Sequence, residues 1–175
     1  MRALPAVLLL AMGSTASADT IGGVGFNISG VLGAGRTHTD AKTSGGVAWA
    51  FRPELLFRHT PESRWGLGPF VELGSIGDAG FLAATGATLS IPLGGALVLA
   101  PSVGVFTGTV FDLGWAGGYT VGAFFGRREL NDISYFDASL GLRADYRRSF
   151  SGDRDGFSVC LQLDLVLIAA FGAMM

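Results

Sequence analysis

Seven polar side chains stand on one phase of an alternating pattern, and their types suit an ionic network: Arg52, Glu54, Glu72, Arg143, Asp145, Gln162 and Asp164. Residues two apart in an extended strand point to the same face. An uncompensated charge in a dry, narrow space is strongly destabilising, so these acids and arginines must pair with one another. The pattern predicts a ladder of ion pairs along the lumen of a closed barrel. We interpret this ladder as a plug, with a gated polar pore as the alternative.

Residues that could act in catalysis are few. A Ser–His–acid arrangement needs a histidine that reaches both the nucleophile and the acid. The chain has two histidines, His38 and His59, and neither stands in a His-x-Ser motif. His38 lies beside Asp40 in an expected outer link, where three serines could approach it: Ser44, Ser75 and Ser151. We therefore predict no enzyme, and a hydrolase or acyltransferase that modifies lipid A is the alternative.

No metal or cofactor site is predicted. His38 and Asp40 offer two candidate ligands, fewer than a closed metal site needs. The acidic run SGDRDG lacks the full calcium-loop pattern, and the glycine-rich run GVGFNISGVLGAG lacks the Lys-Ser/Thr of a phosphate loop. Cys160 is alone, which excludes an internal disulfide, and it falls on the inward phase as a small packing residue.

The elements that must position the polar residues are β-strands. In residues 157–171 every odd position is apolar, whereas the even positions include Ser158, Cys160, Gln162 and Asp164. Such alternation is typical of a strand with two different faces. The design repeats eight times and predicts an all-β fold, an eight-stranded antiparallel up-and-down transmembrane β-barrel. The expected strands are 22–35, 46–58, 65–75, 80–91, 96–107, 117–127, 134–147 and 157–171.

The first 18 residues have the pattern of a secretory signal peptide. Arg2 precedes an apolar run over residues 3–12, and Ala16-Ser17-Ala18 fits the A-x-A cleavage site. We expect cleavage before Asp19, so that residues 1–18 are removed and residues 19–175 form one barrel domain.

Composition places the chain toward the membrane class. Charged residues make up 15% and hydrophobic residues 49%, with a mean hydropathy of +0.47. The uncharged stretch 79–111 is interrupted by glycine and proline, so we interpret it as a hairpin that turns at residues 92–95 rather than as a membrane helix. Because only helices and closed barrels can span a lipid bilayer, a closed barrel is the fold that we predict. The formal charge of −2 does not indicate the basic surface that nucleic-acid binding needs.

The apolar face is predicted to meet lipid. A water-exposed face would be rich in lysine and glutamate, yet Lys42 is the sole lysine. Aromatic residues gather toward both ends of the strands, as the two bilayer interfaces select: Trp49, Phe51, Phe57, Trp65, Phe81, Tyr119, Phe125, Phe136, Tyr146, Phe157 and Phe171. A soluble periplasmic barrel that holds an apolar ligand is the alternative.

Connection lengths suggest an orientation. With the amino terminus on the periplasmic side, the outer links are RTHTDAKTSG, SIGDAG, GTVFDLGWAG and RSFSGDRDG, and the inner links are TPESR, PLGG and RRELND. Outer links are expected to be mostly longer than inner ones.

The pattern resembles the small outer-membrane barrels of the OmpA transmembrane-domain and OmpX type. The resemblance rests on the leader MRALPAVLLLAMGSTASA, on eight alternating strands and on a last strand that ends in an aromatic, Phe171. In that family the final aromatic usually ends the chain, whereas here four residues follow it. The resemblance implies an outer-membrane barrel without a peptidoglycan-binding domain.

These observations predict a monomeric protein of the cell outer membrane, in contact with outer-membrane lipid, with a structural or surface-interaction role. A surface ligand or protein would meet the outer links at residues 36–45 and 108–117, the latter with Phe111 and Trp115. We expect no nucleic-acid partner and no cofactor.

Overall fold

The computed structural model describes residues 23–40, 42–60, 63–77, 80–109, 115–129 and 138–164. Within these residues the chain forms strands and no helix, so no described helix could cross a membrane. The strands are β1 (Gly23–Thr39), β2 (Thr43–Arg58), β3 (Gly66–Ile76), β4 (Leu82–Gly94), β5 (Leu97–Thr109), β6 (Trp115–Glu129), β7 (Ala138–Ser149) and β8 (Arg154–Asp164).

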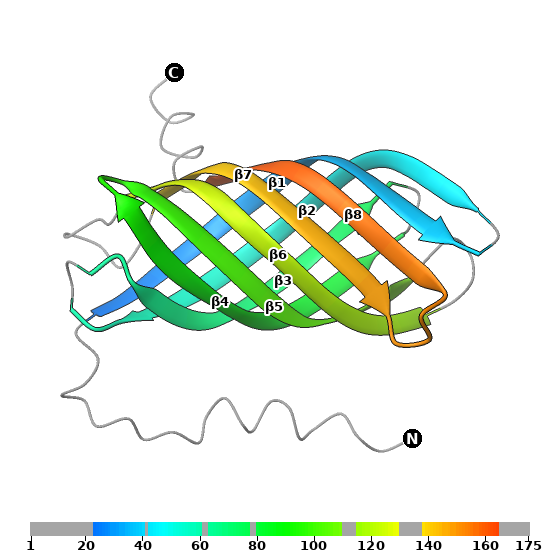
Figure 1. The fold of residues 1–175 in the computed structure, drawn as a ribbon, viewed down its shortest axis with the longest axis horizontal. Coiled ribbons are helices and arrows are strands. Elements are labelled where there is room, and N and C mark those ends of the chain that lie inside the picture. Colours follow the sequence, from blue (N-terminus) through cyan, green and yellow to red (C-terminus); the bar gives the residue numbers. More distant parts are fainter. Residues whose placement is uncertain are drawn as a thin grey trace, which may run out of the picture.

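The eight strands close into a barrel (Figure 1). Each strand pairs antiparallel with its neighbours in sequence, and β8 pairs back with β1 from Ser29↔Asp164 to Thr39↔Arg154. Closure gives β1 and β8 partners on both sides, which removes the open edge of a sheet. The predicted eight-stranded antiparallel up-and-down barrel is confirmed.

The barrel has two rims. We call the end where β1 begins the N-terminal rim, at the left of Figure 1, and the opposite end the distal rim. At the N-terminal rim residues 95–96 join β4 to β5, within one residue of the predicted turn. Gly94 and Gly95 have φ of 130° and 53° there, a region that favours glycine because it has no Cβ.

The predicted links at the distal rim were too long. Residues 36–39 belong to β1 and residues 43–45 to β2, and His38 pairs with Thr43 in the ladder. The β-branched threonines of this run favour a strand. Two links lie wholly within the described residues, the distal link 150–153 and the N-terminal link 95–96. The other links include residues outside the described ranges, so the expectation that the outer links are longer stays a prediction.

Side chains alternate between a buried inner phase and an exposed outer phase. Along β3 the burial alternates strictly from Gly66 to Leu73. The outer phase exposes large apolar side chains, with Leu32 at 62% and Val103 at 60%. The inner phase holds three small apolar clusters rather than one core: Val31 with Ala48, Ile76 and Cys160; Phe70 with Leu82, Ala84 and Phe106; and Val98 with Ala100 and Phe124.

Glycines on the inner wall make room for aromatic rings. A Cβ added to Gly126 would lie 2.7 Å from Cζ of Phe124, and one added to Gly141 would lie 2.8 Å from Cε2 of the same ring. A Cβ on Gly118 would lie 2.5 Å from Cε1 of Phe106. Since these distances are shorter than normal packing allows, the glycines let the narrow lumen hold phenylalanine side chains.

Candidate functional site: the polar lumen

The seven residues predicted to form the ionic network all lie inside the barrel. Each is at most 3% exposed. They come from β2, β3, β7 and β8, and alternation along each strand turns them inward. The lumen of an eight-stranded barrel is just wide enough for side chains to fill it, so these groups meet across it.

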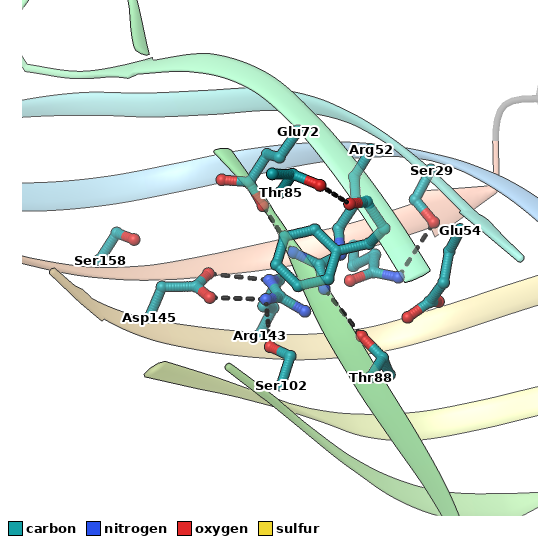
Figure 2. A network of polar contacts seen from close by, with 12 residues as sticks. Ser29, Arg52, Glu54, Glu72, Thr85, Thr88, Ser102, Arg143, Asp145 and Ser158 are labelled. Atoms are coloured by element: carbon teal, nitrogen blue, oxygen red, sulfur yellow. Dashed lines mark hydrogen bonds and ion pairs between the residues drawn. The ribbon is translucent and has the colours of Figure 1, made fainter. Parts of the chain in front are cut away.

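Glu72 on β3 is held between two arginines. Its Oε2 accepts from Nη1 of Arg52 on β2 at 2.9 Å, and its Oε1 accepts from Nη2 of Arg147 on β7 at 2.5 Å. Nη2 of Arg52 donates to Oγ1 of Thr88 on β4 at 3.0 Å (Figure 2). One carboxylate therefore links strands on opposite sides of the lumen. Arg147 stands on the polar phase of the seventh strand but was not among the predicted network residues.

Arg143 and Asp145 form a two-pronged ion pair along β7. Nε of Arg143 donates to Oδ2 of Asp145 at 2.8 Å, and Nη2 donates to Oδ1 at 2.6 Å. Nη2 also donates to Oγ of Ser102 on β5 at 2.9 Å (Figure 2). Paired hydrogen bonds of this kind are among the strongest that side chains make, so Asp145 is compensated despite its burial.

Glu54 pairs with a residue that the sequence analysis assigned to a link. Its Oε2 accepts from Nη2 of Arg128 at 2.7 Å, and Arg128 is 2% exposed. The run RRELND was predicted as an inner link, but β6 continues to Glu129 and turns Arg128 inward. The signal that could have found it is the alternation of β6, in which Arg128 shares the phase of Phe124.

Two arginines of the network also contact aromatic rings. The guanidinium carbon of Arg52 lies 3.4 Å from the ring centroid of Phe70, and that of Arg128 lies 5.6 Å from the centroid of Phe124. A guanidinium over an aromatic face is stabilised by the ring's quadrupole, and the effect falls with distance. The polar and apolar parts of the lumen are therefore interleaved.

Gln162 and Asp164 belong to a second polar cluster that joins β1, β7 and β8. Nδ2 of Asn27 donates to Oδ2 of Asp164 at 2.8 Å and to Oγ of Ser139 at 3.1 Å. Nε2 of Gln162 donates to Oγ of Ser29 at 3.0 Å, and Ser29 donates to Oδ1 of Asn27. Asn27, Ser29 and Ser139 were not predicted, although all three stand on inward phases.

The network draws on more strands than expected. Strands two, three, seven and eight were predicted to supply nearly all of it, yet Thr88, Ser102 and Arg128 come from β4, β5 and β6. The hydroxyl groups of Thr88 and Ser102 carry no charge, so they were not among the residues predicted from the sequence. They matter because Thr88 and Ser102 each accept a hydrogen bond from an arginine two strands away along the barrel wall.

The lumen contains no nucleophile activated by a histidine among the described residues. His38 lies exposed on the outer face of β1, with its Nδ1 2.7 Å from Oγ1 of Thr43. His59 follows β2 and is exposed. In the part of the chain that the structure describes, no group of three or more His, Cys, Asp or Glu residues is arranged to hold a metal ion.

The predicted interface aromatics that the structure describes lie on the outer face. Eight are between 39% and 52% exposed and Tyr146 is partly exposed, whereas Phe136 and Phe171 lie outside the described residues. The eight are Trp49, Phe51, Phe57, Trp65, Phe81, Tyr119, Phe125 and Phe157. Trp115 and Phe150 add two strongly exposed aromatics at the distal rim, at 70% and 71%.

No protein-family model matches the chain, and no curated protein matches it.

Proposed function

We propose that this chain is an outer-membrane β-barrel protein whose lumen is closed by the ionic network and whose role is structural or in surface interaction. The observation that carries the proposal is the outer face. Leu32, Val47, Val103 and Leu142 are 57–62% exposed there, on different strands around the barrel. An apolar belt of this extent is unfavourable in water and matches the hydrocarbon of a bilayer.

The inner face supports the same proposal because its polarity is inverted relative to a barrel in water. Arginine, glutamate and aspartate are buried in the lumen, while leucine and valine are exposed outside. A soluble ligand-binding barrel would place its apolar residues around an internal cavity. Here the inward phase instead holds paired ions and three small apolar clusters.

The filling of the lumen supports a plug rather than a pore. The cavity beside Glu72, Arg147 and Ser158 encloses about 10 Å³, which is the room one water molecule needs. The phenyl rings of Phe70 and Phe124 and the ion pairs occupy the space around the axis.

The distal rim is the proposed surface-facing end. It carries the β1–β2 hairpin with exposed Arg36 and His38, and the exposed rings of Trp115 and Phe150. The leader at residues 1–18, expected to direct export, lies outside the described residues. In this orientation the short N-terminal turn at residues 95–96 faces the periplasm.

Fractionation tests the location. The full chain, expressed in a Gram-negative host, is expected in the outer-membrane fraction, with a gel mobility that changes on heating because the folded barrel resists the detergent. Recovery in the soluble periplasmic fraction would instead support the soluble barrel. Planar-bilayer recordings of the purified barrel are expected to show no steady conductance, and regular single-channel currents would contradict the plug.

A lipid A-modifying enzyme is tested separately, through His38. Mass spectrometry of lipid A from cells with the wild-type chain and with His38→Ala is expected to give the same profile. A change that appears with the wild-type chain and is lost in the variant would replace the structural role with an enzymatic one.

A further inference from the structure

The charged residues on the outer wall of the described strands form two groups, one at each rim. The outward positions of β2, β3, β4 and β5 carry no charge, because every charged residue of these strands points into the lumen. The group at the N-terminal rim consists of Arg127 and Glu129 on β6. The group at the distal rim consists of Arg148 on β7, Asp155 on β8 and Arg36 on β1, and we call these three residues the distal charged sector.

The arginines of the two groups differ in how they are compensated. At the N-terminal rim Nη2 of Arg127 donates to Oε1 of Glu129 at 2.6 Å. Arg36 and Arg148 are both exposed, and within the described residues neither side chain makes an ion pair or a hydrogen bond. The distal rim therefore presents two guanidinium groups that a ligand outside the barrel can reach.

Asp155 lies beside Arg148 without pairing with it. The two residues are partners in the β7–β8 ladder, yet no ion pair joins their side chains. Nη2 of Arg148 instead extends toward the link at residues 150–153, where a Cβ added to Gly152 would lie 3.8 Å from it. With two arginines and one carboxylate, the distal charged sector keeps a net positive charge.

The ladder brings the two arginines close enough to act on one ligand. Arg36 pairs with Phe157 on β8, and Arg148 pairs with Asp155, which lies two residues before Phe157 on the same strand. Two strand spacings and a shift of two residues place the Cα atoms of the arginines about 12 Å apart. Side chains as long as those of arginine can approach a common group across this distance.

Aromatic side chains share the outer face with these arginines. Tyr146 and Arg36 are both ladder partners of Phe157, and Tyr119 is the ladder partner of Arg148. Aromatic rings at the ends of the strands of a membrane barrel lie at the level of the lipid headgroups. If the barrel resides in a membrane, the two guanidinium groups lie at that level as well.

We propose that the outer wall at the distal ends of β7, β8 and β1 binds the phosphate group of a lipid in the surrounding leaflet, with Arg36 and Arg148 as the donors. A guanidinium matches phosphate oxygens with paired hydrogen bonds. The lipid phosphate would supply the acceptors that these two arginines lack within the described residues, as Glu129 does for Arg127. The inference rests on the proposed function, because a lipid is available only to a barrel in a membrane, and it adds the headgroup chemistry and the part of the wall that binds it.

Three matched probes test the ligand chemistry: dioctanoyl phosphatidic acid, dioctanoylglycerol and inorganic phosphate. The full chain, folded in micelles of a neutral detergent without phosphate, is titrated with each probe while the NMR signals of the Nε–H groups of Arg36 and Arg148 are followed. Because an arginine near an anionic headgroup contributes about 1 kcal/mol, phosphatidic acid should shift both signals saturably and bind at least about 5-fold more tightly than either other probe. Equal binding of dioctanoylglycerol would overturn the phosphate, and equal binding of inorganic phosphate would overturn the lipid. No saturable shift with phosphatidic acid would overturn the site.

Variants of the exposed arginines test the residues, with a control at the other rim. Arg36→Gln and Arg148→Gln should each weaken binding of phosphatidic acid about 3-fold or more, and the double variant should lose the preference over dioctanoylglycerol. Arg127→Gln, which removes an exposed arginine that already has a carboxylate partner, should leave binding unchanged. Equal losses in all three single variants would mean that the barrel attracts phosphate through its overall charge, which overturns the site.

Asp155→Asn gives a change in the opposite direction. The carboxylate of Asp155 lies next to Arg148 in the ladder and opposes an anion, so its removal should tighten binding of phosphatidic acid about 2-fold. Unchanged or weaker binding in a variant that keeps its heat-dependent gel mobility would place the phosphate elsewhere and overturn the proposal.

Fractionation separates a failure of this inference from a failure of the proposed function. A barrel that is recovered with the outer membrane but shows no preference for phosphatidic acid overturns the lipid site alone. A barrel that is recovered in the soluble periplasmic fraction overturns the membrane location, and the lipid site with it.

Discussion

The outer wall and the lumen are made from alternate residues of the same strands, yet different interactions stabilise them. Val103 is 60% exposed, while its neighbour Ser102 is 6% exposed and accepts a hydrogen bond from Arg143. Apolar burial is non-directional and depends on the surrounding medium, whereas a buried ion pair depends on its particular partner. Substitutions on the outer wall should therefore respond to the medium, and those in the lumen to the partner.

The largest effect is expected in the lumen from Arg143→Leu. The change leaves Asp145 buried without its two-pronged partner, and breaking a buried pair costs about 3–5 kcal/mol. The free energy of unfolding, measured by urea titration in lipid vesicles, should fall by that amount. The double variant Arg143→Leu/Asp145→Leu should recover most of the loss, because no charge is then left unpaired. If the double variant is as unstable as Arg143→Leu, the unpaired charge of Asp145 is not the cause of the loss.

The next effect is expected on the outer wall from Val103→Arg. Val103 lies midway along β5, and an arginine that faces lipid at the bilayer midplane costs about 2–4 kcal/mol. The matched control is Phe150→Arg in the link after β7, where the side chain is 71% exposed and the cost should be about 0–1 kcal/mol. The same urea titration measures both. Equal stabilities would argue that the outer wall faces water.

A smaller effect compares two rings inside the lumen. Phe70 and Phe124 are both buried, but the guanidinium of Arg52 lies 3.4 Å from the first ring and that of Arg128 lies 5.6 Å from the second. Phe70→Leu should cost about 2 kcal/mol and Phe124→Leu about 1 kcal/mol, because the closer cation–π contact is lost with the ring. The difference between the two titrations is the measurement. A larger loss at Phe124 would assign the effect to packing alone.

The smallest effect is expected at the distal rim, where a carboxylate is exposed. Hydrogen bonds from Ser151 and Ser149 lower the pKa of Asp153 below its ordinary value. A carboxyl group with a lowered pKa stabilises the folded state above its unfolded pKa, and this contribution disappears as the pH falls through the folded value. Ser151→Ala should raise the pKa of Asp153, as read from an NMR titration of its carboxyl carbon. A pKa that does not rise would mean that Ser151 has no influence.

The two faces of the wall could be predicted from the sequence because alternation is a local property. Arg52 and Glu54 stand two residues apart, so the strand alone turns both inward. Trp49 and Phe51 fall on the opposite phase by the same rule. Eight alternating segments were enough to predict a barrel, since the expected membrane environment leaves only helices and closed barrels as ways to satisfy the backbone.

The partners within the lumen could not be predicted in the same way. Glu72 meets Arg147, 75 residues away, because strand tilt and register bring them to one level. Those quantities depend on all eight strands at once. Strand ends were also missed: Arg36 and His38 lie among glycines and threonines that could form a loop or a strand, and pairing with β2 decides between them. Arg128 was likewise assigned to a link because the end of β6 could not be predicted from the sequence.

The cluster of Asn27, Ser29, Ser139, Gln162 and Asp164 has a consequence for how the protein assembles. Most neighbouring strands are joined by short links and can zip together as local hairpins, whereas the seam between β1 and β8 closes a loop of more than a hundred residues. Asn27 can reach Asp164 only when that seam has shut. We therefore expect the hydrogen bonds of this cluster to form in the last step of folding. A chain that lacks them should accumulate as an open, curved sheet in which β1 and β8 are unpaired edge strands.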